Sequence, residues 1–117
     1  FCQVDFKIYG DTSKVPVYVW IILEPCLKEA FTNIVRHSNG SYVHVELDIT
    51  SYIVRLSIEN NGVKEGKPLM YGIGLYNLNQ RVSYAGGTLS TNVSGETYRL
   101  ICVLPLGRKE EHEDTNC

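Results

Sequence analysis

Five stretches of the chain carry the pattern expected of β-strands. In two of them apolar and polar residues alternate strictly with a period of two, the first stretch alternates more loosely, and the last two flank a short turn at Gly95. The predicted strands are residues 2–9, 42–48, 52–60, 88–93 and 97–106. Val54, Leu56 and Ile58 share one face of the third strand. The same parity directs Asn60 toward the core side, where a polar group needs a partner or a ligand.

Two further stretches have the period of an α-helix. The first covers residues 15–38, and Pro16 suits its opening turn. Pro25 falls inside this helix, so a kink or two abutting helices are expected. The second helix is predicted over residues 73–85 and stops at Gly86-Gly87.

Strand pairs separated by helices predict an α+β fold. The expected architecture is a two-layer α/β sandwich, with the helices on one face of a mixed, mostly antiparallel sheet. Residues 1–106 form this single domain, and residues 107–117 are a charged tail that we expect to be disordered. No apolar run is long enough to span a membrane.

Charge and cysteine content narrow the class of protein. The tail accounts for the whole formal charge of −2, so residues 1–106 are balanced and offer no basic nucleic-acid surface. The four cysteines are far apart, form no CxxC pair and indicate neither a zinc site nor a disulfide framework, which fits a reducing cytosol.

The first helix carries an unusual polar face. Four polar residues lie at positions i, i+4, i+7 and i+8 and share one side: Glu29, Asn33, Arg36 and His37. A separate apolar stripe, pointing roughly the opposite way, consists of Leu27, Ala30, Phe31, Ile34 and Val35. For an arbitrary helix the polar set is most often only a solvated face.

Two glycines open the second helix. Gly72 and Gly74 would let backbone N–H groups approach an anion at a helix N-terminus, although many such glycines only form turns. Asn77 replaces the third glycine of a dinucleotide-binding fingerprint, and a loop precedes the motif, so that interpretation is poor. Asn60 is open to a second reading as a turn former before Asn61-Gly62.

These motifs occur in a fixed order: E-x-x-x-N-x-x-R-H, then a strand ending N-N-G, then G-x-G-L-x-N-x-x-x-R. The order resembles the ATP-binding domain of bacterial two-component sensor histidine kinases, which share a superfamily with gyrase, MutL and the ATP-dependent Hsp chaperones. The resemblance runs from about residue 21 to residue 106 and implies the Bergerat-type ATP-binding fold. The segment between the two glycine motifs is short, as in the reduced-lid subgroup, and its Lys64 and Lys67 are either phosphate contacts or solvated.

The resemblance implies a role for each motif residue. Asn33 would be a ligand of Mg²⁺, with Glu29 as the catalytic acidic residue near the metal. Asn60 would contact adenine. The remaining expected ATP-binding residues are Arg36, His37, Gly62, Gly72, Ile73, Gly74 and Leu75.

The resemblance also implies an activity and partners. The expected reaction transfers the γ-phosphoryl group of ATP to a histidine on dimerisation helices upstream of Phe1, in a homodimer that serves a response regulator. This cytosolic domain would make no direct membrane contact. The sequence leaves open whether the longer protein is anchored in a membrane. Two alternatives stay open: a related protein-serine kinase acting on a sigma-regulating partner, and a non-catalytic module. Asn60, where the family usually has Asp, is the support for the second.

Overall fold

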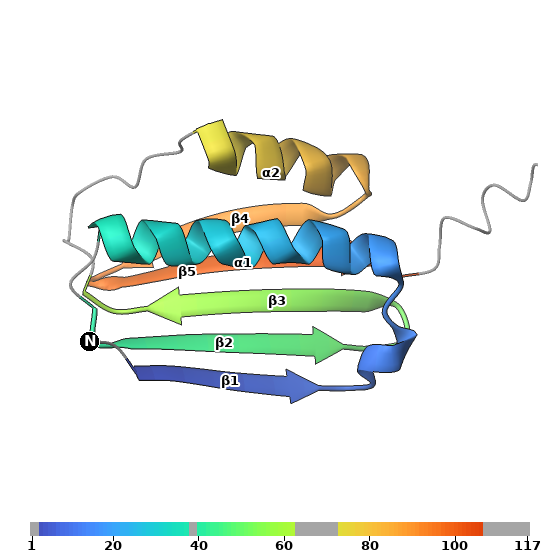
Figure 1. Ribbon diagram of the computed structural model, residues 1–117, viewed down its shortest axis with the longest axis horizontal. Helices are drawn as coiled ribbons and strands as arrows, with labels where there is room; N and C mark the ends of the chain where they lie inside the picture. The colour runs from blue at the N-terminus through green and yellow to red at the C-terminus, as the bar shows by residue number, and fades with distance from the viewer. Residues whose placement is uncertain (1–2, 38–39, 63–72, 107–117) are drawn as a thin grey trace, which may run out of the picture.

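The computed structural model describes residues 3–37, 40–62 and 73–106, which fold into two layers (Figure 1). The strands are β1 (Gln3–Tyr9), β2 (Tyr42–Ile49), β3 (Ile53–Asn60), β4 (Thr88–Ser94) and β5 (Thr97–Pro105). The helices are α1 (Val17–His37) and α2 (Ile73–Tyr84), with a short 3-10 helix η1 (Thr12–Lys14). Every predicted element is present, and the α+β class with a two-layer sandwich is confirmed.

The sheet has the strand order β1-β2-β3-β5-β4. β1 runs parallel to β2, and the other neighbouring strands are antiparallel, as predicted for a mixed, mostly antiparallel sheet. Both helices lie on the same face of this sheet (Figure 1). The parallel pair requires a crossover, which η1 and α1 provide.

The chain turns from β1 into the crossover at Gly10. Its φ of +103° lies in the left-handed region, which an L-residue adopts only with strain. Asp11 then caps η1, because its Oδ1 accepts hydrogen bonds from the Ser13 N–H at 3.0 Å and the Ser13 hydroxyl at 2.7 Å.

Helix α1 is continuous through Pro25, so the expectation of two abutting helices is wrong. Its core side repeats at helical spacing and is fully or nearly buried: Val19, Leu23, Cys26, Ala30 and Ile34. Burying a large aliphatic side chain stabilises the fold by about 1.5–3 kcal/mol, which offsets the hydrogen bond that the proline removes.

The apolar stripe predicted on α1 is correct for Ala30 and Ile34 and wrong for Val35. Val35 is 81% exposed, whereas Leu27 and Phe31 pack partly against the core. The reason is angular: Val35 lies about 100° around the helix from Ile34. This rotation carries it past the sheet-facing side, into solvent.

β3 confirms the parity argument from the sequence. Val54, Leu56 and Ile58 are at most 4% exposed, and Asn60 on the same face is 1% exposed. From the second helix, Leu75, Leu78 and Val82 complete the core.

The two helices leave part of the sheet uncovered. Val4, Phe6 and Ile8 of β1 point to the helix side in register with β2, yet they are 45–56% exposed. In the described part of the chain, no helix is long and apolar enough to cross a membrane.

Candidate functional site

Three element ends lie toward one side of the molecule. The C-terminal ends of α1 and β3 lie at the left in Figure 1, and the N-terminal end of α2 lies toward the same side, nearer the middle. They carry the three sequence motifs, which are separated along the chain and which the fold brings to one region. This convergence defines the candidate site.

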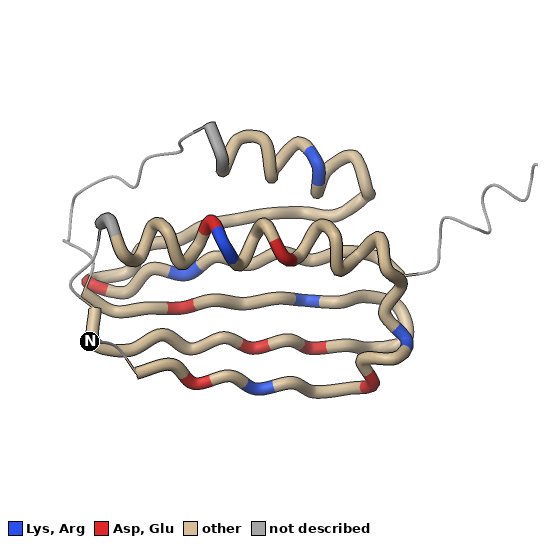
Figure 2. Tube along the Cα trace, in the orientation of Figure 1, with Lys and Arg blue, Asp and Glu red and all other residues tan. Residues whose placement is uncertain are grey.

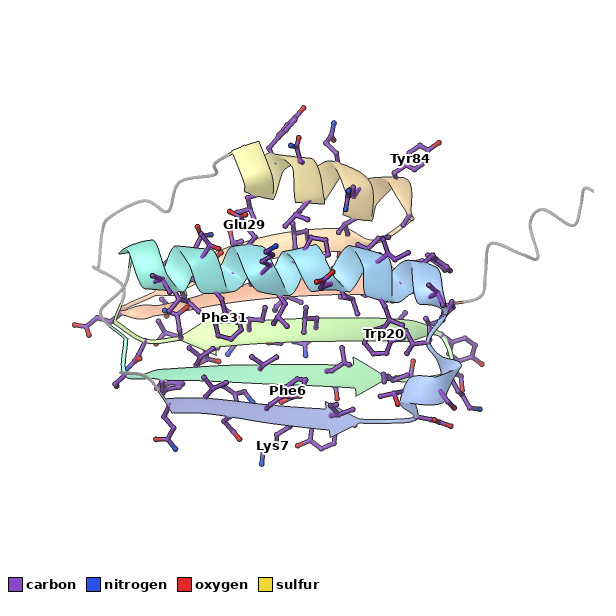
Figure 3. The ribbon with its side chains drawn as sticks, in the orientation of Figure 1. Phe6, Lys7, Trp20, Glu29, Phe31 and Tyr84 are labelled. Carbon is purple, nitrogen blue, oxygen red and sulfur yellow. The ribbon has the colours of Figure 1, made fainter. Side chains whose placement is uncertain are left out.

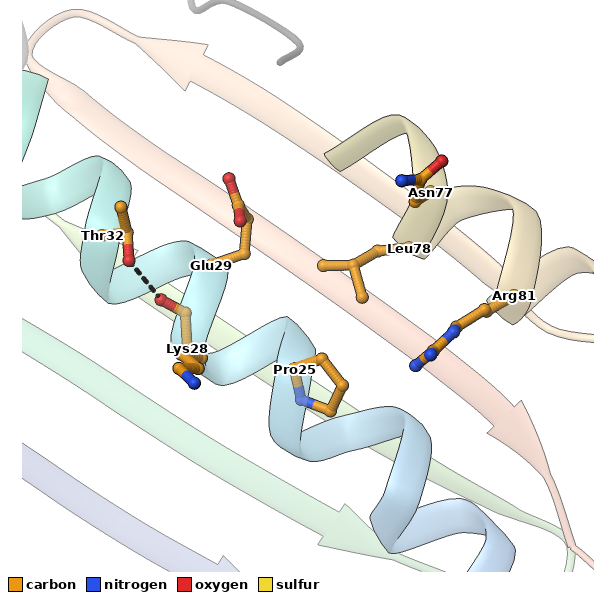
Figure 4. A pocket seen from close by; sticks show the side chains of 7 residues that line it. All are labelled: Pro25, Lys28, Glu29, Thr32, Asn77, Leu78 and Arg81. Atoms are coloured by element: carbon orange, nitrogen blue, oxygen red, sulfur yellow. Dashed lines mark hydrogen bonds between the residues drawn. The ribbon is translucent and has the colours of Figure 1, made fainter. Parts of the chain in front are cut away.

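Glu29 and Asn33 are half-buried on α1. Glu29 lines a cleft of about 320 Å³ between α1 and α2 (Figure 4). The cleft is lined by Pro25, Lys28, Glu29 and Thr32 of α1 and by Asn77, Leu78 and Arg81 of α2. Of the residues predicted on the polar face of α1, Glu29 therefore borders this cleft, and Asn33 is not among the residues that line it.

Opposite charges enter this cleft from its two walls. The Glu29 carboxylate points toward α2, and the Arg81 guanidinium reaches toward α1 (Figure 4). Thr32 takes little part, because its hydroxyl donates to the Lys28 carbonyl of its own helix at 3.0 Å. A carboxylate and a guanidinium at one opening suit a ligand that carries both a metal cation and anionic oxygens.

Asn60 lies at the end of β3 and faces the helix layer. Across the sheet it is in register with Val43 on β2 and Tyr98 on β5, both nearly fully buried. Its Nδ2 donates to the Asn61 carbonyl at 3.0 Å. A buried amide between an aliphatic and an aromatic neighbour is a suitable environment for hydrogen bonding to a heterocycle.

Asn61 holds the end of β3 in place, a role that the sequence analysis did not assign. Its Oδ1 accepts from the Ser41 and Tyr42 N–H groups at 2.9 and 3.1 Å, and its Nδ2 donates to the Ser41 hydroxyl at 3.1 Å. Gly62 follows with a φ of +85°, which favours glycine. The turn chemistry therefore belongs to Asn61 and Gly62, whereas Asn60 points inward.

Several predicted site residues are only partly described. Arg36 and His37 lie in the last turn of α1 and Ile73 and Gly74 in the first turn of α2, but the surroundings of these four residues lie outside what the structure describes. Leu75 is 2% exposed and belongs to the hydrophobic core. Gly72, Lys64, Lys67 and the tail of residues 107–117 also lie outside the described residues. The nucleotide contacts expected of all these residues stay predictions.

The α2 wall of the cleft was not among the predicted site residues. Asn77 and Arg81 stand at i and i+4 of α2, so they share a face next to the buried Leu78. The signal was present in the motif G-x-G-L-x-N-x-x-x-R. Its meaning depends on the packing of α2 against α1, which a single helical pattern does not reveal.

Comparison with known proteins gives consistent relatives. No family model matches the chain. The sensor protein VraS of Staphylococcus haemolyticus is 30% identical over 117 residues, which is 96% of this chain and 34% of that protein. The sensor histidine kinase MctS of Rhizobium johnstonii is 30% identical over 88% of this chain and 23% of its own length. The chain spans between 22% and 34% of the length of the curated relatives that it matches.

Solved structures agree on the fold. The blue-light activated histidine kinase of Erythrobacter litoralis EL346 superimposes with a TM-score of 0.72 at 21% identity, over 95% of this chain and 38% of that one. The catalytic domain of the histidine kinase ThkA superimposes with a TM-score of 0.63 at 17% identity, covering 88% of this chain and 79% of that domain.

The two-layer sandwich is the fold of histidine kinase catalytic domains. The chain is related to the sensor histidine kinases over most of its length and has the fold of their catalytic domains.

Proposed function

We propose that this chain is the catalytic domain of a sensor histidine kinase and binds Mg²⁺–ATP on the side of the molecule toward which the motif-bearing ends of α1, β3 and α2 lie. The observation that carries the proposal is Asn60, a polar side chain only 1% exposed that faces the helix layer on that side. The relatives and the shared fold supply independent support.

The base would lie over the end of β3. The amide of Asn60 offers an acceptor for the exocyclic amino group of adenine, and Val43 and Tyr98 flank it with apolar surface. GTP carries a carbonyl at the equivalent ring position, so it cannot donate this hydrogen bond. The site should therefore prefer adenine over guanine nucleotides.

The phosphates and the metal would lie along the polar side of α1. Among the described residues, no group of three or more His, Cys, Asp or Glu side chains is gathered as a metal site. In the proposal, a magnesium ion would be held mainly by nucleotide phosphates, with the Asn33 amide oxygen as the hard ligand from the protein. When bound, Mg²⁺ would neutralise part of the charge of the nucleotide phosphates.

The residues of this chain would contribute position and charge. Glu29 is placed to orient a reacting group near the metal, and Arg81 opposes negative charge from the α2 wall. Phosphoryl transfer needs little covalent chemistry from the protein, so this inventory is sufficient for the class of reaction.

The phosphoryl acceptor would be a histidine in a dimerisation segment of a longer, homodimeric protein, and a response regulator would receive the group next. The relatives support this architecture, because they are sensor kinases of which this chain spans at most about a third. His37 is not the acceptor in this scheme, since it lies on the helix that also carries Asn33.

The test is calorimetric titration of the chain with ATP, with and without Mg²⁺. The parent should bind ATP more tightly when Mg²⁺ is present. Asn33→Ala should abolish that Mg²⁺-dependent gain while leaving the melting temperature close to that of the parent, because Asn33 is only half-buried.

Val35→Ala is the matched control on the same helix. Val35 is 81% exposed, so its truncation should change neither affinity nor stability. An unchanged Mg²⁺ dependence in folded Asn33→Ala would refute the metal assignment. A parent chain that binds no ATP under either condition would refute the proposed function itself.

A further inference from the structure

β1 forms one edge of the sheet, and its whole length is exposed. Each of its residues, Gln3 to Tyr9, is open to solvent, and only β2 pairs with it. One row of backbone N–H and C=O groups on an edge strand points away from its sheet and can pair with another strand. This edge is therefore a template for β-sheet extension.

The side chains of β1 are symmetric about Phe6. The central five residues read apolar, acidic, apolar, basic, apolar: Val4, Asp5, Phe6, Lys7, Ile8. Asp5 and Lys7 lie on the face away from the helices, and Figure 2 shows one acidic and one basic position along the middle of β1. Lys7 extends outward past the edge of the sheet (Figure 3).

We propose that β1 is the contact surface for a second copy of this chain, in an antiparallel pair centred on Phe6. A two-fold axis at Phe6 puts Asp5 opposite Lys7 of the second copy, and Lys7 opposite its Asp5. Directly opposed side chains of an antiparallel pair lie within reach of an ion pair. The strand is thus complementary in charge to itself in this one register, and two five-stranded sheets join into a continuous sheet.

The same axis buries apolar surface on the helix side. Val4 comes opposite Ile8 of the second copy, and the two Phe6 rings meet at the axis, where each ring is 56% exposed in the single chain. Behind them, an apolar groove of about 450 Å³ runs between α1 and the β1–β2 edge, with Trp20 and Ile21 on its helix wall. The grooves of the two copies would lie side by side, and their apolar patches would become continuous across the paired strands.

A lysine on an edge strand also has a protective use, since it discourages pairing with foreign strands. That use does not account for Asp5 at the position related by symmetry. Asp5 is held at the edge by His44 of β2, whose Nδ1 lies 2.9 Å from its Oδ2. Its carboxylate is thereby fixed on the face where Lys7 of a second copy would arrive.

The experiment is sedimentation equilibrium on the 117-residue chain at protein concentrations up to about 1 mM, the weak end of specific association. The parent should form a dimer. Asp5→Lys and Lys7→Asp should each weaken dimerisation by about tenfold or more, because each replaces two attractive pairs with two repulsive ones. Raised salt should weaken the parent dimer, since these pairs are exposed.

An equimolar mixture of the two single variants tests the charge pairing directly. One copy then presents two lysines and the other two aspartates, so a heterodimer should form although neither variant dimerises well alone. The double variant Asp5→Lys/Lys7→Asp should also recover self-association. Only Asp5→Lys removes the contact with His44, so equal weakening in both single variants separates charge repulsion from loss of that contact.

Circular dichroism melting confirms that each variant is folded. A parent chain that stays monomeric at the highest concentration would overturn the proposal. A dimer that both charge reversals leave unchanged would place the contact elsewhere, and would overturn it equally.

Discussion

At the scale of a residue, Asn60 is a buried polar side chain in an otherwise apolar core. Among the buried residues that the structure describes, it alone is polar, and its Nδ2 donates to the Asn61 carbonyl. Under the proposed function the amide has two tasks: its Nδ2 donates to the Asn61 carbonyl at the end of β3, and the side chain contacts the adenine base. A substitution separates these tasks.

Asn60→Asp should tighten ATP binding by about fivefold, because a hydrogen bond to a charged acceptor is worth roughly 1 kcal/mol more than a neutral one. It should also destabilise the ligand-free chain, since a carboxylate oxygen replaces the group that donates to the Asn61 carbonyl. Asn60→Ala should weaken binding. Three dissociation constants from calorimetry and three urea titrations measure both effects.

If the three dissociation constants agree within error, Asn60 does not contact the base. GTP gives a control for the same point. Its affinity should be low for the parent and should change little across the series, because its ring carbonyl cannot donate to any of the three side chains.

At the scale of an element, the junction between β1 and the crossover depends on Gly10. Its φ is +103°, and a Cβ added there would lie 2.2 Å from the Ile49 carbonyl oxygen. Gly95, in the β4–β5 turn, also has a positive φ, of +61°, but a Cβ there would meet nothing within 4 Å. Both positions therefore have a backbone conformation that strains any residue other than glycine, but only at Gly10 is there no room for a Cβ.

Gly10→Ala should lower the free energy of unfolding by about 2–4 kcal/mol, because strain and a backbone clash add. Gly95→Ala should cost only about 1 kcal/mol, from strain alone. Urea denaturation of both variants against the parent measures the difference. Equal losses would mean that the backbone near Ile49 yields without cost.

The elements were predictable because their periods are strict. The alternation in β3 placed Asn60 on the buried face, and this was correct because a period of exactly two leaves no drift along eight residues. The 3.6-residue period of α1 left more freedom, and Val35 at the flank of the stripe was assigned to the wrong side. The continuity of α1 at Pro25 depended on burial along the helix, which outweighs the lost hydrogen bond.

The site was predictable only in part. The polar position of Glu29 follows from the helical face of one segment, whereas Asn77 and Arg81 join it at the cleft only because α2 packs against α1. The role of Asn33 stays a prediction. The anchoring by Asn61 likewise requires Ser41, twenty residues earlier, to lie beside it. Such pairings are tertiary, and local patterns carry no information on them.

At the scale of the whole molecule, α1 is joined to the centre of the sheet through two thiols. Cys26 of α1 and Cys102 of β5 are both 0% exposed and unoxidised, and their side chains are hydrogen-bonded to each other. The hydrogen bond to Cys26, together with burial, raises the pKa of Cys102 far above its usual range. Neither thiol is accessible to a reagent without opening of the core.

Alkylation of these two thiols should therefore report on unfolding of the whole domain. Both should react with iodoacetamide at the same slow rate. This rate should rise with urea concentration as the free energy of global unfolding falls. Peptide mass mapping follows each site separately. Modification of one thiol without the other, or a rate independent of urea, would instead indicate local opening of α1.

The position of β5 has a consequence for synthesis of the chain. Of the described strands β5 comes last in the sequence, yet it lies inside the sheet between β3 and β4. When Asn60 has been made, the ribosome still has to add the 45 residues up to Pro105 before β3 can gain its second neighbour. At roughly 5–20 residues per second, this takes about 2–9 s. During that interval Val54, Leu56 and Ile58 stand on an open strand edge, so the nascent chain passes through a state in which chaperone binding competes with aggregation.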